Sequence, residues 1–350
     1  MTGSLKLEKE PTSILIILMG SIGDVTRGLS LAHQIKINFP TVKLTWLVEP
    51  ACKTIVSLNQ YVDRVIVYDR PKNIFALPKL VKELREENFD ITLDLQRHSK
   101  SGFFSALSAA PLRIGFDPSS SKEFNHLFNN HHIEALPPGS PKLQSYLSFI
   151  KKLGKDVTYP LDFGLKKVKD QPQQKALLEN LSGDYVCFIL GSSWESKDWT
   201  AEGYIALAGK ILSATALKIV LLGDKTQTKI AAEVESAISD NIRVINLAGK
   251  TSLTDVVAVI DKSKFALGPD SGPGHISGAL GKNYISLFGP TDPRLTAPIG
   301  SENLVIQSNL GCMPCYKRKC PGLGKLCMHL ISADKVFEKV KGLASGQINE

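Results

Sequence analysis

Residues 268–275 read Gly-Pro-Asp-Ser-Gly-Pro-Gly-His and lie between an apolar run at 265–267 and a small-residue segment at 276–281. The apolar run predicts a strand, the glycines and prolines a tight loop, and the small residues a helix. The backbone N–H groups of Ser271 and Gly272 would then point out of the helix N-terminus, an arrangement that binds phosphate. This stretch therefore predicts a nucleotide or sugar-phosphate site.

A second loop of the same kind follows the next apolar run. Residues 284–288 are apolar, and residues 289–293 read Gly-Pro-Thr-Asp-Pro. Two strand-loop units in a row indicate neighbouring strands of a parallel sheet, and open α/β sheets bind ligands at the carboxyl ends of their strands. Because each loop carries an acid and a hydroxyl, we favour a binding site over two loops that only turn the chain.

Strands alternate with helices through most of the remaining chain. Residues 13–19 predict a strand, which ends in the glycine loop at 20–24 and is followed by a helical apolar pattern at 25–37. The alternation weakens between 117 and 160 and resumes with a strand at 185–190. This pattern predicts two similar α/β halves, each with a parallel, doubly wound sheet.

The domain boundaries follow from this alternation. We expect an N-terminal domain at 1–168 and a C-terminal domain at 169–332, with a charged linker around 166–174 that Pro172 interrupts. A final helix lies within 333–350. A ligand would then bind in the cleft between the two domains.

Composition and charge narrow the class of protein. Of the 350 residues 43% are hydrophobic and 22% charged, which is typical of a globular protein. The apolar runs are strand-sized, and residues 1–12 are too polar for a signal peptide, so we expect a cytoplasmic protein. The net charge of +8 favours an anionic substrate or an anionic membrane surface. Zinc-finger spacing, aromatic RNA-binding patterns and long basic helices are all missing from the sequence, which argues against nucleic acid.

Several motifs together resemble those of the ADP-heptose:lipopolysaccharide heptosyltransferases, glycosyltransferase family 9. They are Ser-Ile-Gly-Asp-Val at 21–25, Asp-Leu-Gln at 94–96 before Lys100 and Ser101, Arg-Ile-Gly-Phe at 113–116, Ser-Trp-Glu-Ser-Lys at 193–197 before Trp199, Gly-Asp at 223–224, Asp-Ser-Gly-Pro at 270–273 with His275, and Phe-Gly-Pro-Thr-Asp-Pro at 288–293. Each motif alone is weak. Their order and spacing over nearly the whole chain are specific.

The resemblance implies an α/β GT-B fold, with an N-terminal Rossmann-like acceptor domain, a C-terminal Rossmann-like nucleotide-sugar domain and a final helix that packs back across the domains. It implies an inverting glycosyltransferase that needs no metal and no cofactor, only ADP-heptose as co-substrate. The enzyme would transfer L-glycero-D-manno-heptose to the inner core of lipopolysaccharide, peripheral to the inner face of the inner membrane. Its acceptor would be lipid A bearing either Kdo or a first heptose.

Two alternatives stay open at this point. One is a family 9 glycosyltransferase that uses a different nucleotide sugar. The other is a nucleotide- or glycan-binding protein without catalysis on the same scaffold, against which the presence of both Asp24 and Lys197 speaks.

Inverting transfer needs a base for the acceptor hydroxyl and a cradle for the departing diphosphate. Asp24 matches the family's proposed base, although an acid at that position also serves to cap the first helix. Lys197 matches the lysine that faces the diphosphate, and its neighbours Trp194 and Trp199 argue against a merely solvated side chain. These two residues are the expected catalytic pair.

The remaining binding residues are grouped by substrate. The expected donor-binding residues are Ser192, Ser193, Asp270, Ser271, Gly272 and His275. The resemblance places Asp270 near the heptose hydroxyls, and it leaves His275 either in contact with the ligand or packed inside the protein. Arg97 and Lys100 are expected to bind phosphate or carboxylate on the acceptor, or else to be solvated surface charges. Many family members have Met where this chain has Gly274.

Four of the six cysteines cluster near the C-terminus, at Cys312, Cys315, Cys320 and Cys327. Their spacing is compatible with a structural zinc site, with reduced thiols or with a partial disulfide. The basic residues between them, at 317–319, would meet acceptor phosphates, lipid headgroups or solvent. Cys52 and Cys187 lie in apolar runs and are expected to be buried thiols.

Overall fold

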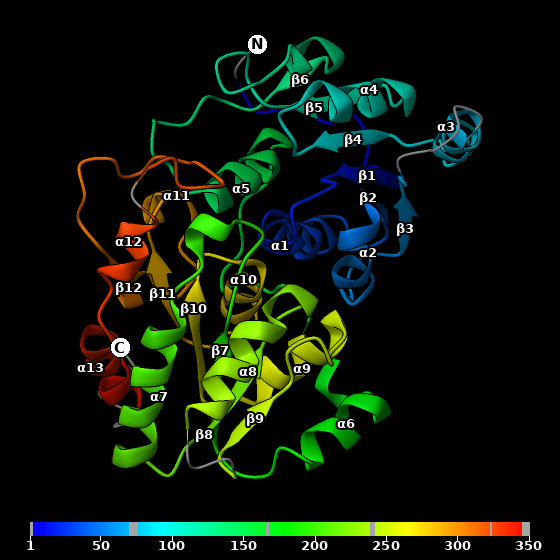
Figure 1. The fold of residues 1–350 in the computed structure, drawn as a ribbon. Coiled ribbons are helices and arrows are strands. Elements are labelled where there is room, and N and C mark those ends of the chain that lie inside the picture. The colour runs from blue at the N-terminus through cyan, green and yellow to red at the C-terminus, as the bar shows by residue number, and fades with distance from the viewer. Residues whose placement is uncertain (1–2, 70–75, 166–167, 239–241, 323, 345–350) are drawn as a thin grey trace. The chain divides into compact units, whose positions relative to one another are not determined.

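The structure, a computed structural model, describes residues 3–69, 76–165, 168–238, 242–322 and 324–344. The chain forms two compact units, Met1–Leu165 and Lys166–Glu350 (Figure 1). Each unit contains one parallel six-stranded sheet with helices on both faces.

The first sheet has the strand order β3-β2-β1-β4-β5-β6. Its strands are β1 (Ser13–Ile17), β2 (Lys43–Val48), β3 (Arg64–Val67), β4 (Ile91–Asp94), β5 (Leu112–Gly115) and β6 (His131–His132). Every residue of β1 is buried, because helices cover both faces of the parallel sheet and both sets of alternating side chains lie in the core.

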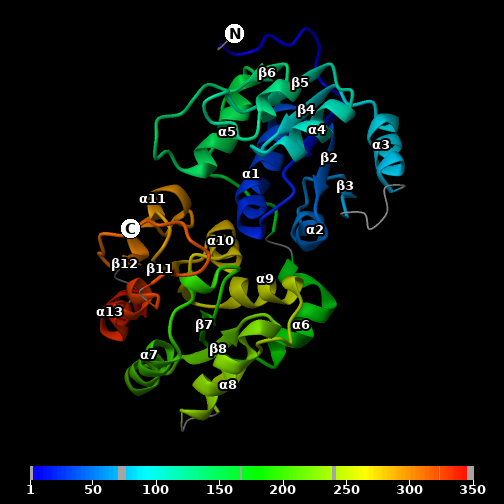
Figure 2. The same cartoon turned by 45° about the horizontal axis from the view of Figure 1, so that its top comes forward.

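The helices of the first unit are α1 (Ile22–Asn38), α2 (Pro50–Ser57), α3 (Ala76–Glu86), α4 (Ser99–Leu107), α5 (Lys142–Lys152) and the 3₁₀ turn η1 (Asn125–Phe128). Figure 2 shows α3 and α4 together beside the sheet. Leu84 of α3 and Phe104 of α4 belong to one buried cluster with Leu15 and Ile17 of β1. The intervening residues of β1 point to the opposite face.

The second sheet repeats the winding of the first, with the order β12-β11-β10-β7-β8-β9. Its strands are β7 (Tyr185–Ile189), β8 (Lys218–Leu222), β9 (Val244–Asn246), β10 (Phe265–Pro269), β11 (Tyr284–Phe288) and β12 (Val305–Gln307). The expected neighbouring strands 265–267 and 284–288 are β10 and β11, which pair in parallel.

The second unit contains eight α-helices among its described residues. They are α6 (Pro172–Glu179), α7 (Ala201–Ala214), α8 (Thr228–Ser236), α9 (Leu253–Lys262), α10 (Gly272–Ala279), α11 (Pro293–Thr296), α12 (Leu326–His329) and α13 (Ala333–Ala344), with 3₁₀ turns η2 (Val168–Asp170), η3 (Glu195–Lys197), η4 (Lys225–Gln227) and η5 (Glu302–Leu304). Tyr185 of β7 donates to the Val259 carbonyl of α9 on one face, while Phe188 packs toward α7 on the other.

The final helix α13 packs inside the second unit. Val336 and Val340 are fully buried in the same cluster as Ile211 of α7. The apolar face of α13 packs against α7, where those valines complete the core of the second unit.

The segment expected to be a linker is partly helical. Within its described part, η2 and the first residues of α6 are ordered elements. Pro172 begins α6 rather than interrupting the chain, because the first helical position needs no backbone N–H. Residues 166 and 167 lie outside the described residues.

Each sheet reverses its winding direction between its two central strands, at β1 and β4 in the first unit and at β7 and β10 in the second. Such topological switch points open a crevice at the carboxyl ends of the strands, where ligands bind. Asp24 and Arg97 follow the first pair of strands, and Lys197 and Asp270 follow the second. The fold thus gathers the expected site residues at two equivalent positions.

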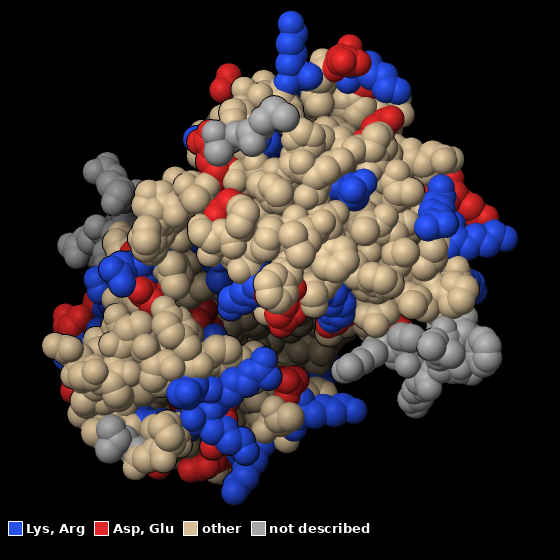
Figure 3. All heavy atoms as spheres, turned by 90° about the horizontal axis from the view of Figure 1, so that it is seen from above, with Lys and Arg blue, Asp and Glu red and all other residues tan. Residues whose placement is uncertain are grey.

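No helix within the described residues is both long and apolar enough to span a membrane. On the face shown in Figure 3, several Lys and Arg side chains gather in the lower part of the view with Asp and Glu side chains beside them, and most of the upper part is uncharged.

Candidate functional site

The first cluster begins at the loop that joins β1 to α1. Ser21 is the N-cap of α1, and its hydroxyl donates to the Asp24 carboxylate over 3.1 Å. Asp24 lies in the first turn of the helix, where its charge interacts favourably with the helix dipole. Because Ser21 is the N-cap, helix capping is not the role of Asp24.

Two cations hold the Asp24 carboxylate. Its Oδ1 accepts hydrogen bonds from Arg27 Nη2 at 2.5 Å and from Lys142 Nζ of α5 at 2.9 Å. Burial alone would raise the pKa of Asp24, but the charges of Arg27 and Lys142 outweigh burial and hold that pKa well below its usual range. In this arrangement Asp24 is an anion with little tendency to accept a proton.

A cavity of about 200 Å³ in the first unit opens beside Asp24. It is lined by Leu18, Gly20, Asp24, Leu95, Gln96, Arg97, His98, Phe116, Lys122, Lys142, Ser145 and Tyr146. The Arg97 guanidinium lies 4.4 Å from the centre of the Phe116 ring, a cation–π contact that fixes its position. Since three permanent cations and one carboxylate line the cavity, it suits an anionic ligand.

Lys100 lies away from the lining of this cavity. It is in the first turn of α4, forms an ion pair with Glu49 and lies 5.8 Å from the Tyr68 ring centre. Of the two expected acceptor-binding residues, the structure therefore brings only Arg97 to Asp24.

The second cluster is built around a buried ion pair. Lys197 Nζ lies 2.8 Å from Asp270 Oδ2, and the two side chains are only 13% and 6% exposed. The ammonium also lies 4.5 Å from the centre of the Trp194 ring. Lys197 is thus held on two sides, at the switch point of the second sheet.

Asp270 is the hub of this cluster. Besides Lys197, its Oδ2 accepts a hydrogen bond from the Thr291 hydroxyl at 2.9 Å, and its Oδ1 lies 3.6 Å from His275 Nε2. Burial would raise the pKa of Asp270, but His275 and Lys197 together hold it well below its usual range. Both carboxylate oxygens are therefore engaged by the protein, and His275 is a packed partner of Asp270.

The helix after Asp270 begins earlier than expected. Ser271 is the N-cap and Gly272 the first residue of α10, because Pro273 is tolerated within the first turn. The first N–H groups of a helix lack partners within it, so those of Ser271 and Gly272 are available to an anion, whereas Pro273 has no N–H. The buried Ser271 hydroxyl has no hydrogen-bond partner among the described residues.

Ser192 stabilises the conformation of the loop that carries Lys197. Its hydroxyl accepts from the Trp194 N–H at 3.1 Å and donates to Asp198 Oδ1 at 3.0 Å. Burial raises the pKa of Asp198 to about 6. Ser193 is exposed and remains available for a ligand.

The cysteine-rich segment supports the same loop. The Ser196 N–H donates to the Arg318 carbonyl at 3.2 Å, and the Ser196 hydroxyl donates to the Lys317 carbonyl at 2.6 Å. The Arg318 guanidinium lies 5.8 Å from the Trp194 ring centre. Through these contacts the basic residues between the cysteines hold the backbone beside Lys197.

The cysteines show no formed metal site. Throughout the part of the chain that the structure describes, no three His, Cys, Asp or Glu side chains are placed to hold a metal ion. Burial raises the pKa of the Cys327 thiol, with a further contribution from the charges of the other three clustered cysteines.

Arg27 and Lys142 were missed from the sequence, and the contact of Thr291 with Asp270 was not predicted, although Thr291 belongs to the predicted loop at 289–293. Arg27 follows Asp24 by one helical turn, a spacing that pairs opposite charges, so this contact was readable. Lys142 is 118 residues from Asp24, and Thr291 is 21 residues from Asp270. Only the three-dimensional fold brings these two to their partners.

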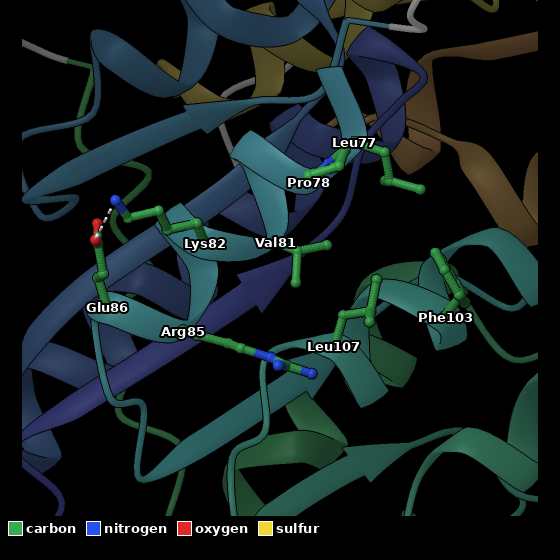
Figure 4. Close-up of a pocket in the computed structure, with 8 residues that line it drawn as sticks. All are labelled: Leu77, Pro78, Val81, Lys82, Arg85, Glu86, Phe103 and Leu107. Atoms are coloured by element: carbon green, nitrogen blue, oxygen red, sulfur yellow. Dashed lines mark ion pairs between the residues drawn. The ribbon is translucent and has the colours of Figure 1, made fainter. Parts of the chain in front are cut away.

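A second cavity in the first unit, of about 660 Å³, contains none of the expected site residues. Figure 4 shows it between α3 and α4, with apolar side chains on both helices and the Lys82–Glu86 ion pair at its edge. It is lined by Leu77, Pro78, Val81, Lys82, Arg85, Glu86, Phe103 and Leu107. Five of these eight residues are apolar, and the three charged ones, Lys82, Arg85 and Glu86, all come from α3.

Comparison with known proteins agrees with this picture. The sequence profile of glycosyltransferase family 9 (heptosyltransferase) matches residues 77–325. The chain is 27% identical to the lipopolysaccharide core heptosyltransferase OpsX of Haemophilus influenzae, over 85% of this chain and 84% of that protein. It is also 27% identical to lipopolysaccharide heptosyltransferase 1 of Escherichia coli strain K12, over 84% of this chain and 93% of that protein.

The fold is also found in a solved structure. The E. coli heptosyltransferase WaaC with ADP matches 95% of this chain and 99% of its own length, with a TM-score of 0.75 and 23% sequence identity. The same enzyme has been solved with ADP-2-deoxy-2-fluoro heptose. The two parallel six-stranded sheets are thus the two sheets of a GT-B fold, as expected.

Proposed function

The chain belongs to glycosyltransferase family 9, and from that membership we propose that it transfers L-glycero-D-manno-heptose from ADP-heptose to the inner core of lipopolysaccharide, with inversion at the anomeric carbon. The observation that carries the proposal is the buried cluster of Lys197, Asp270, His275 and Thr291 beside the N-terminus of α10. A fixed cation next to free backbone N–H groups suits a diphosphate.

The second unit would hold the donor. Lys197 and the N–H groups of Ser271 and Gly272 would take up the negative charge that grows on the diphosphate as the bond to the anomeric carbon breaks. Asp270 would act mainly through Lys197, because its oxygens already accept from Lys197 and Thr291. Ser193 would add a hydroxyl contact. Neither a metal nor a cofactor is part of this proposal.

The first unit would hold the acceptor. Asp24 would take the proton of the acceptor hydroxyl as its oxygen attacks the anomeric carbon, on the face opposite the leaving ADP. Arg97 would bind an acid group of the acceptor, lipid A bearing Kdo or a first heptose. Because such an acceptor is membrane-bound, the enzyme would work at the anionic inner face of the inner membrane.

The relatives support this choice of substrate. Both proteins that share 27% identity over most of the chain are named as lipopolysaccharide heptosyltransferases, and the structurally similar WaaC was solved with ADP and with a fluorinated ADP-heptose. A family 9 enzyme with a different nucleotide sugar is the competing proposal. It differs in the donor that is consumed, so a donor panel separates the two.

The test is release of ADP from ADP-heptose by the purified full chain with an inner-core acceptor. We expect ADP and glycosylated acceptor in equal amounts. In Lys197→Met we expect kcat to fall about a hundredfold or more, which is the usual effect of removing one contact to the transition state. Lys229→Met, at an exposed lysine of α8, is the matched control and should be unaffected. Turnover of another nucleotide sugar without turnover of ADP-heptose would overturn the choice of donor.

A further inference from the structure

The two cations on Asp24 differ in how firmly they are held. Arg27 extends from the same helix as Asp24, and its side chain is only 10% exposed. Lys142 reaches Asp24 from α5, its side chain is 42% exposed, and it lines the cavity beside Asp24. Arg27 is therefore a fixed partner of the carboxylate, whereas Lys142 can exchange Asp24 for a ligand without disturbing α1.

The groups that face Asp24 come from several elements. Ser21 and Arg27 face it from the start of α1, Lys142 and the buried Tyr146 from α5, and Cys52 from α2, where burial raises the pKa of the thiol to about 12. Arg97, His98 and Lys122 line the same cavity from the loops after β4 and β5. Among these groups only Lys142 both contacts Asp24 and lines the cavity as a cation.

We propose that Lys142 is a movable counter-ion that couples acceptor binding to release of the Asp24 carboxylate. An acid group of the acceptor, a carboxylate or a phosphate, binds Arg97, Lys122 and Lys142 in the cavity and draws the Lys142 ammonium from Asp24. Asp24 then keeps one cation, Arg27, besides the hydrogen bond from the Ser21 hydroxyl, and it can accept the proton of the acceptor hydroxyl. This inference rests on the proposed function and deepens it, since it gives the acid group of the acceptor a role in releasing Asp24.

Moving Lys142 from Asp24 to the acceptor would make Asp24 a stronger base. A carboxylate that two cations hold far below its usual pKa is a weak base, and a general base works best when its pKa is closer to the operating pH. Removing one cation from Asp24 moves its pKa in that direction. Lys142 itself gains and loses no proton: the hydroxyl proton goes to Asp24, the hydroxyl oxygen bonds to the anomeric carbon, and the electrons of the broken bond leave with ADP.

The test compares two acceptors in two enzymes. One acceptor carries its acid group, and the other is the same compound with that group converted to a neutral ester. In the wild-type protein we expect kcat to fall about tenfold or more with the ester, because Lys142 then stays on Asp24; this is the scale of one charge-assisted hydrogen bond. In Lys142→Met the ratio of the two kcat values should fall toward one, since no ammonium remains to be moved.

Further variants separate this role from a structural one. Lys142→Arg keeps the charge and should restore most of the kcat ratio, while Lys151→Met, at an exposed lysine of the same helix, should leave it unchanged. The acidic limb of the kcat/KM profile should shift to higher pH in Lys142→Met, because in the enzyme without acceptor the Asp24 carboxylate has lost one cation and its pKa is higher. A residue that only stabilised α5 would lower kcat equally for both acceptors.

Failure of the inference is distinguishable from failure of the proposed function. If ADP-heptose and the acid acceptor react but the kcat ratio is the same in wild type and Lys142→Met, Lys142 is no movable counter-ion, although the enzyme is a heptosyltransferase. If neither acceptor yields ADP with ADP-heptose while another nucleotide sugar is consumed, the proposed function is wrong, and the same four measurements with that sugar then decide the role of Lys142.

Discussion

Breaking the buried Lys197–Asp270 pair should destabilise the second unit strongly, although the pair lies at the edge of the sheet where we propose that the donor binds. At a separation of 2.8 Å the attraction is about 6 kcal/mol with an effective dielectric constant of about 20. Most of this offsets the cost of taking both charges out of water. Removing one partner alone leaves the other buried and unpaired, which typically costs about 3–5 kcal/mol.

The two single variants should not cost the same. Asp270→Asn removes the charge that holds Lys197 and also weakens the contacts to His275 and Thr291, so it belongs at the upper end of that range. Lys197→Met leaves Asp270 with His275 and Thr291 and belongs at or below the lower end. The double variant should cost less than the sum of the two, with a coupling of at least about 1.5 kcal/mol.

Denaturant unfolding of the full chain provides the measurement. The transition of the second unit is followed by the fluorescence of Trp194 and Trp199 in a Trp46→Phe background, because Trp46 lies in the first unit. The exposed Lys264–Asp184 pair of the same unit, at 3.0 Å, is the matched control and should show a coupling below about 1 kcal/mol. Additive effects of Lys197→Met and Asp270→Asn, each below about 1 kcal/mol, would refute the reasoning from burial.

Three further outcomes follow from buried groups. Burial raises the pKa of Asp94 to about 6 from 3.8, so between these two pH values the folded first unit binds more protons than the unfolded chain. The unfolding free energy of the wild-type protein, measured by urea titration, should therefore decrease by up to about 3 kcal/mol as pH rises from about 4 to 6. Asp94→Asn should lack this decrease. Gly274→Ala should cost about 1–3 kcal/mol in the same assay, because its Cβ would lie 2.7 Å from a ring carbon of the buried Tyr284; an unchanged midpoint would contradict this. A thiol reagent at pH 8 should label the exposed Cys312 in the folded protein and reach Cys187, whose pKa burial raises to about 12, only after unfolding, as mass spectrometry of the labelled peptides would show.

Much of the fold could be predicted from the sequence, because the patterns that mark its strands and helices lie within short runs of consecutive residues. A buried strand followed by a glycine loop and a helix is encoded in consecutive residues, and this pattern predicted β1, β7, β10 and β11 close to their observed bounds. Elements that lack this pattern of strand, glycine loop and helix were not predicted, among them α2 and α4. The helix α4 begins at Ser99 with a polar turn, so Lys100 reads as part of a loop in the sequence although it is helical.

The candidate site was readable only in part. Asp24, Lys197 and Asp270 follow strands directly, so their place at the sheet edge could be inferred from order alone. Their contacts could not. Lys142 comes from another element, and nothing in its own neighbourhood marks it. Thr291 lies in the predicted loop at 289–293, but its hydrogen bond to Asp270 was not visible in the sequence. For the same reason the role of Asp270 as the counter-ion of Lys197 was not visible in the sequence.

The most direct test of the central claim is a mass-balanced transfer assay with Asp24→Asn. The account predicts that the wild-type protein converts ADP-heptose and an inner-core acceptor into ADP and one heptosylated product with inverted anomeric configuration. It predicts that Asp24→Asn loses this activity while it still binds ADP, since Asp24 belongs to the first unit and the diphosphate contacts to the second. Unchanged turnover by Asp24→Asn, or a product with retained configuration, would contradict the account.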